Sequence, residues 1–194
     1  MNGLRGGGSS FGNFRSASTR ATYAPQIDAE LLKSVLVKHD SGVDLLLAPT
    51  SPEEADLVHP DNLASVLAML RTMYDYVVVD VDKRLGDLTL SILDHADEVH
   101  IVMTADLSCL KNVRLVLEAL RRIGFDPKRL KLALNRSNAF TGISVGAAES
   151  ALKREFETKI TNEYRVAISA QNTGSPFSYS KPDAPLSKEI VELA

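Results

Sequence analysis

Residues 76–82, which read Y-V-V-V-D-V-D, constrain the fold of this chain more than any other segment. An unbroken apolar run rich in β-branched residues predicts a strand buried on both faces, as in a parallel sheet. The run ends in carboxylates, where the strand of a nucleotide site would hold a magnesium ion. The phosphate-binding motif G-x-x-x-x-G-K-[ST] occurs nowhere in the sequence. We therefore expect an α/β domain of nucleotide-binding type that lacks its first strand and phosphate loop.

Short apolar runs alternate with amphipathic segments along the rest of the chain. Strands are predicted at 43–48, 76–81, 99–103, 130–134 and 159–160. Helices are predicted at 28–37, from 51 onward, and at 63–73, 88–95, 110–123, 147–156, 165–172 and 185–193. This alternation is typical of a parallel sheet enclosed by helices. The predicted fold class is therefore α/β, with three layers and a mostly parallel sheet that has helices on both faces.

Capping residues mark the ends of several predicted helices. Asp28 is a predicted N-cap, and Ser51 begins the capping box S-P-E-E, with proline at the first helical position. Either Asp106 or Ser108 caps the helix at 110–123, which Gly124 closes.

The composition suits one globular domain and excludes several classes of protein. The chain has 194 residues, of which 44% are hydrophobic, and this allows a substantial core. Its formal net charge of -3 provides no basic field, so no nucleic-acid partner is expected. The single cysteine, Cys109, permits no internal disulfide; we expect a small buried hydrophobe in a reducing cytoplasm. No apolar run approaches the ~18 residues of a membrane span, and no secretion signal is evident.

Residues 1–22 differ in composition from the rest of the chain. They are rich in Gly, Ser and Arg and contain no acidic residue, so we predict a disordered tail. The run G-G-G-S-S at 6–10 does not qualify as a phosphate cradle, because no strand precedes it and no lysine follows it. A basic arm that binds anionic lipid or nucleic acid is the alternative, with only three arginines to support it. The domain proper is placed at 23–194.

Ligands of open parallel sheets bind beyond the carboxyl ends of the strands. The residues at these ends are 49–50, 80–82, 104–106, 135–136 and 161–163. Asp80 is a candidate magnesium ligand, through water, or else a carboxylate that caps the next loop. Asn135 could read a purine edge with its paired donor and acceptor, or it could bond its own backbone in a turn. No catalytic residue is predicted, and the four histidines lack the spacing of metal ligands.

Three segments carry a resemblance to a known family. They are Y-D-Y-V-V-V-D, D-L-S-C-L-K-N-V-R-L-V-L-E-A-L-R-R-I-G-F and L-A-L-N-R. From about residue 28 to the C-terminus, the chain resembles the MinD/ParA family of dimeric P-loop ATPases. Within that family it is most similar to the CpaE/TadZ-like proteins of pilus assembly and polar localisation.

The resemblance implies a set of roles where residues match. Asp80 would end the Walker B strand and help to hold magnesium, and Asn135 with Arg136 would lie beside the adenine of Mg-ATP. Pro176, in a G-x-P segment, would lie near the base. A homodimer is implied, together with pilus-assembly or polar-localisation partners. The location implied is the cytoplasm, at a cell pole or peripheral to the membrane through partners.

Departures from the family pattern lead to two hypotheses. The family's phosphate loop and first strand are missing, and this absence should abolish catalysis and most ATP affinity. The chain is then a partial or degenerate ATPase-family domain, or a non-catalytic module for dimerisation or partner recruitment. Loss of the first strand would also leave sheet edges unpaired, so we predict low stability for the isolated chain.

Overall fold

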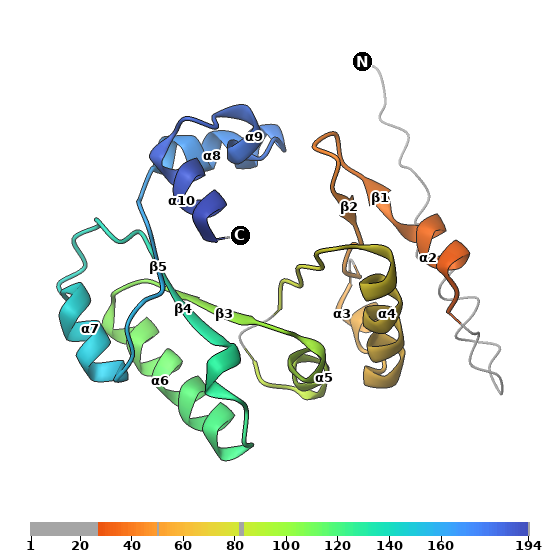
Figure 1. Ribbon diagram of the computed structural model, residues 1–194, viewed down its shortest axis with the longest axis horizontal. Helices are drawn as coiled ribbons and strands as arrows, with labels where there is room; N and C mark the ends of the chain where they lie inside the picture. The colour runs from red at the N-terminus through yellow and green to blue at the C-terminus, as the bar shows by residue number, and fades with distance from the viewer. Residues whose placement is uncertain (1–26, 50, 82–83, 194) are drawn as a thin grey trace. The chain divides into compact units, whose positions relative to one another are not determined.

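The computed structural model describes residues 27–49, 51–81 and 84–193 (Figure 1). The chain divides into two compact units, with the boundary between His95 and Ala96. The tail predicted at 1–22 and the run G-G-G-S-S lie outside the described residues.

In its described residues, the first unit combines four helices with a small antiparallel hairpin. The helices are α2 (Ala29–Val35), α3 (Pro52–Ala55), α4 (Pro60–Met73) and α5 (Asp87–His95). The hairpin pairs β1 (Val37–Lys38) with β2 (Asp44–Leu45). Leu32, Val66 and Leu70 form a buried cluster in this unit, so α2 and α4 pack against each other.

Two of the predicted strands are wrong in this unit. The strand predicted at 43–48 shortens to Asp44–Leu45, and it pairs with a strand that the sequence did not predict. Residues 76–81 form no strand at all. Val77 packs against the cluster of Leu32, Val66 and Leu70, but Tyr76 is 83% exposed and Val78 is 94% exposed. Strand residues need a neighbouring strand for their backbone groups, and none of the described residues pairs with this segment.

The second unit is built on a parallel sheet of three strands. Its order is β3-β4-β5, formed by β3 (Val99–Met103), β4 (Leu130–Asn135) and β5 (Thr158–Ile160). Met103 aligns with Leu134, and Asn135 aligns with Ile160, so the carboxyl ends of the strands lie together. The strands at 99–103 and 130–134 are confirmed, and the strand at 159–160 starts one residue earlier.

Helices follow each strand of this sheet (Figure 1). They are α6 (Leu107–Arg122), the short 3-10 helix η1 (Pro127–Arg129), α7 (Val145–Leu152), α8 (Tyr164–Thr173), α9 (Phe177–Ser180) and α10 (Pro185–Leu193). The predicted helix at 185–193 is confirmed at both ends. The predicted helix at 147–156 was placed too late, because Ser144 caps α7 and Lys153 ends it in a left-handed conformation.

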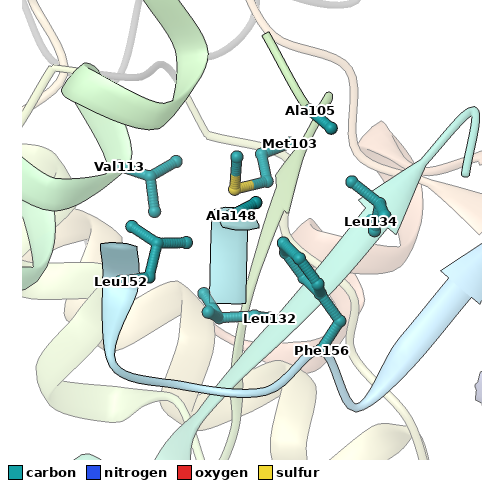
Figure 2. Packing of buried hydrophobic residues seen from close by; sticks show 8 residues of the cluster. All are labelled: Met103, Ala105, Val113, Leu132, Leu134, Ala148, Leu152 and Phe156. Atoms are coloured by element: carbon teal, nitrogen blue, oxygen red, sulfur yellow. The ribbon is translucent and has the colours of Figure 1, made fainter. Parts of the chain in front are cut away.

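The core of the second unit lies between the sheet and two helices, as Figure 2 shows. Leu132 and Leu134 of β4 belong to one buried cluster with Val113 of α6 and Leu152 of α7, and the two leucines of β4 are almost fully buried. Cys109 packs against the same cluster, but it is half-buried, whereas a buried side chain was predicted. Packing of these apolar side chains therefore fixes the strands, and with them the position of the carboxyl ends of the strands.

Helix caps follow the sequence closely. The N–H of Leu31 donates to Asp28 Oδ1 (2.8 Å), and the N–H of Glu54 donates to Ser51 Oγ (3.3 Å). Asp106, and not Ser108, is the N-cap of α6. α4 begins at Pro60, earlier than predicted, and His59 is its N-cap. In the described part of the chain, no helix is both long enough and apolar enough to cross a bilayer.

Candidate functional site

The loops beyond the carboxyl ends of β4 and β5 are joined by hydrogen bonds. The N–H of Ser137 donates to the carbonyl of Ile160 (2.9 Å), and the N–H of Asn162 donates to Asn138 Oδ1 (2.9 Å). The loop after β4 is also tied to the end of β3, because Thr141 Oγ1 donates to the carbonyl of Ala105 (2.6 Å). The three strand ends therefore present one connected edge.

Asn135 ends β4 at this edge and is half-buried. Its Oδ1 accepts a hydrogen bond from the N–H of Arg136 (2.9 Å), which is the local turn bond that the sequence left open. An amide oxygen has two acceptor positions, and the amide nitrogen has two donors. The turn bond therefore leaves Asn135 able to read a purine edge, and that role stays a prediction.

Arg136 adopts a left-handed backbone conformation with φ 55°. Residues other than glycine rarely adopt this region, and they do so where the surroundings hold them in place. Here the Arg136 carbonyl accepts from the N–H of Ala139 (2.9 Å), while the next residue, Ser137, bonds to Ile160. The chain turns sharply at Arg136, and its side chain is exposed at the sheet edge.

Asp106 serves the structure at this edge rather than offering a free carboxylate. Thr104 Oγ1 donates to Asp106 Oδ2 (2.5 Å), and the N–H of Cys109 donates to Asp106 Oδ1 (2.9 Å). The bond from Thr104, followed by that from Cys109, lowers the pKa of Asp106 below its usual value. Its charge is thus fixed at the start of α6, where the helix dipole also favours it.

Two glutamates lock the segment after β5 to α10. The N–H and the Oγ1 of Thr161 donate to the two carboxylate oxygens of Glu189, both at 2.6 Å. In return, the N–H of Leu186, in the first turn of α10, donates to Glu163 Oε2 (3.0 Å). Sequence reasoning pointed to 161–163 as a strand end, but it missed Glu189, because a contact across 28 residues leaves no local pattern.

The other predicted site residues come from other segments of the chain. Pro176 is exposed and precedes α9, where its carbonyl accepts from the N–H groups of Tyr179 (3.0 Å) and Ser180 (2.9 Å). Asp80 belongs to the first unit and is exposed on the unpaired segment 76–81, whereas Asn135, Arg136 and Pro176 belong to the second unit. No group of three or more His, Cys, Asp or Glu side chains that could hold a metal occurs among the described residues.

Comparisons with known proteins bear on this fold. No protein-family model matches the chain. The chain is 24% identical, over 164 residues, to an uncharacterized ATP-binding protein of Methanocaldococcus jannaschii. It is 23% identical, over 168 residues, to the septum site-determining protein MinD of Thermotoga maritima. Each match covers 84% of this chain but 61% of the relative, so the chain corresponds to less than two thirds of either protein.

Solved structures of ParA and MinD proteins superpose on this chain. A ParA family ATPase from Chlorobium tepidum superposes with a TM-score of 0.83 at 22% identity, covering 97% of this chain and 76% of that one. The chain has the fold of the MinD and ParA ATPases. MinD from Pyrococcus horikoshii, in complex with Mg-ADP, superposes with a TM-score of 0.69 at 21% identity, over 84% of this chain and 66% of that one. The predicted α/β fold class is thereby confirmed, and the relation to MinD and ParA is supported.

The residues present fit one part of a Mg-nucleotide better than the other. The edge formed by Asn135, Arg136 and the segment 161–163 offers amide and guanidinium groups suited to a base. For the phosphates, a MinD/ParA-like site would need a glycine-rich loop with lysine, and the motif is missing from the sequence. The role of Asp80, in the first unit, as a magnesium ligand stays a prediction. The fit is therefore to the base and not to the triphosphate.

Proposed function

We propose that this chain is a MinD/ParA-type ATPase-family domain whose second unit contributes the base-binding edge of an adenine-nucleotide site. The observation that carries the proposal is the connected edge beyond β4 and β5. There, Asn135 and Arg136 are followed by Ser137, whose N–H donates to the carbonyl of Ile160, the last residue of β5. The similarity to an ATP-binding protein and to a MinD bound to Mg-ADP supports the choice of nucleotide.

The wider role follows the CpaE/TadZ-like resemblance. The proposed setting is pilus assembly or polar localisation, as a homodimer in the cytoplasm that reaches a cell pole or the membrane surface through partners. Asp80 and Pro176 are the proposed metal and nucleotide contacts beyond Asn135 and Arg136. We do not propose that this chain alone hydrolyses ATP, because the phosphate-binding motif is missing from its sequence.

A second candidate is an interaction module that binds no nucleotide. One observation favours it, namely the exposed apolar segment 76–81, in which Val78 is 94% exposed and Tyr76 is 83% exposed. Apolar surface of this kind marks contact sites for other polypeptides. Dimerisation that depends on concentration and needs no ATP would favour this candidate over the first.

A titration with a fluorescent ATP analogue separates the two candidates. Under the nucleotide proposal the chain binds the analogue, unlabelled ATP competes, and Asn135→Ala weakens binding about tenfold, as expected for a lost hydrogen-bonding pair. Asn112→Ala, the same substitution at an exposed position of α6, serves as the control and should bind as the parent does. A parent chain that is folded but shows no binding contradicts the nucleotide proposal.

A further inference from the structure

Glu163 and Glu189 form a reciprocal pair of contacts between the end of β5 and helix α10. Each carboxylate binds backbone N–H groups of the opposite segment, Glu189 at Thr161 and Glu163 at Leu186. Hydrogen bonds to an ionised acceptor are shorter and about twice as strong as neutral ones. Glu189 uses both of its oxygens on one residue, so the contact fixes orientation as well as distance.

Residues at or next to these contacts in the sequence are buried. Ile160 and Leu186 are each 6% exposed, and Ser187 is fully buried. Ser187 Oγ has the carbonyls of Lys181 (2.7 Å) and Phe177 (3.1 Å) as its hydrogen-bond acceptors, and α9 is held to α10 in this way. Apolar burial keeps the helix in place but does not set the direction of the chain after β5, because the hydrophobic effect is not directional. The two carboxylates supply that direction.

From Thr161 a short chain of hydrogen bonds reaches the candidate base site. Asn162, the next residue, donates to Asn138, and Ile160, the residue before, accepts from Ser137. Ser137 directly follows Arg136. The position of α10 is thus transmitted through three consecutive residues, 160–162, to the loop that carries Asn135 and Arg136.

We propose that Glu189 and Glu163 are positioning residues, through which α10 sets the conformation of the base-binding edge. The part of this inference that concerns nucleotide rests on the proposed function. Neither glutamate is expected to touch the nucleotide, because their carboxylates are engaged at the segment after β5. A partner that displaced α10 would therefore loosen the edge without occupying it.

Amide hydrogen exchange tests the positioning role without any ligand. Glu189→Ala removes both acceptors, and we expect about tenfold faster exchange at Asn162 and Ser137, with unchanged exchange in β4, as for a local opening. Glu192→Ala, an exposed change on the same helix, is the matched control. Glu189→Gln keeps one acceptor and should fall between the two. Equal rates in Glu189→Ala and Glu192→Ala would overturn the proposal, and so would a uniform rise that includes β4, since that would indicate general destabilisation.

Binding of the fluorescent ATP analogue in the presence of magnesium tests the link to the base site. We expect Glu189→Ala to weaken binding at least fivefold, with partial recovery in Glu189→Gln and none of this loss in Glu192→Ala. If exchange changes locally but the affinity does not, the claim that α10 sets the base-binding edge is wrong. If the parent chain binds no analogue, the proposed function fails, and the exchange rates still decide whether the glutamates position the loop.

Discussion

Asn138 accepts a hydrogen bond from the N–H of Asn162 (2.9 Å), and this bond joins the loops that follow β4 and β5. The two residues are 24 positions apart in the chain. Asn135 lies three residues before one of them, and Tyr164 begins α8 two residues after the other. The bond therefore connects two loops that are far apart in the sequence, and no local sequence pattern predicts this connection.

Removal of this bond should cost a modest amount of stability. We expect Asn138→Ala to lower the free energy of unfolding by about 0.5–1.5 kcal/mol, the usual net value of a single hydrogen bond. Urea unfolding followed by circular dichroism measures it. Asn112→Ala, on the exposed face of α6, should leave the midpoint within error or slightly raise it, since alanine favours helix. A loss for Asn138→Ala no larger than for this control would mean that the loops are held without the bond.

The core of the second unit should respond to truncation as a close-packed interior does. Leu132 is fully buried, so Leu132→Ala should lower the free energy of unfolding by about 2–5 kcal/mol. Leu115→Ala removes the same atoms from a side chain that is 55% exposed on α6, and it should change stability by less than about 0.5 kcal/mol. Urea midpoints that shift equally in both variants would contradict the described core.

Local patterns predicted most of the second unit correctly. The strand at 99–103 and the helix at 185–193 match the structure at both ends, because apolar periodicity and capping residues act over a few positions. The sequence offered two N-cap candidates for α6, Asp106 and Ser108. The hydrogen bond from the Cys109 N–H to Asp106 identifies Asp106 as the cap. Interactions that join distant segments, such as Thr161 with Glu189, had no signal in the sequence.

The first unit shows where a local pattern fails. Residues 76–81 have the composition of a buried strand, yet a strand exists only if a neighbouring backbone accepts its hydrogen bonds. Sequence composition describes the segment and not its neighbour. The same reason explains β1 and β2, since residues 43–48 pair over two positions only and with a partner at Val37–Lys38 that carries no strong strand pattern.

A charged residue at Val78 tests directly whether this segment is unpaired. Because the side chain is 94% exposed, Val78→Lys should change the free energy of unfolding by less than about 0.5 kcal/mol. In a strand buried on both faces, the same change would cost several kcal/mol. Leu70→Ala, at a core position of α4, is the positive control and should cost about 2–5 kcal/mol. A large loss for Val78→Lys would show that 76–81 is a buried strand in solution.

Protonation of Asp106 should account for part of the stability that the second unit loses in acid. Its pKa is lowered in the folded state by the bonds from Thr104 and Cys109, so the charged form is favoured by folding. This contribution is complete above the unfolded pKa of about 4 and is lost as the pH falls through the folded pKa. Asn at an N-cap retains the acceptor without titrating. Asp106→Asn should therefore show a shallower fall in urea midpoint below about pH 4 than the parent.

An equal acid dependence in parent and variant would contradict this role for Asp106. Glu149 acts in the same direction, since the N–H of Phe156 and then Lys159 lower its pKa, so some dependence on pH should remain in the variant.

Thermal unfolding with and without saturating Mg-ATP tests most directly whether this chain has a base-binding edge. A ligand that binds only the folded state adds RT ln(1 + [L]/Kd) to stability, which is about 2.7 kcal/mol at a hundredfold excess over Kd. We expect a higher melting temperature with Mg-ATP, and we expect Asn135→Ala to reduce this increase while Asn112→Ala does not. An unchanged melting temperature in a chain that unfolds cooperatively would contradict it and leave the interaction module as the function.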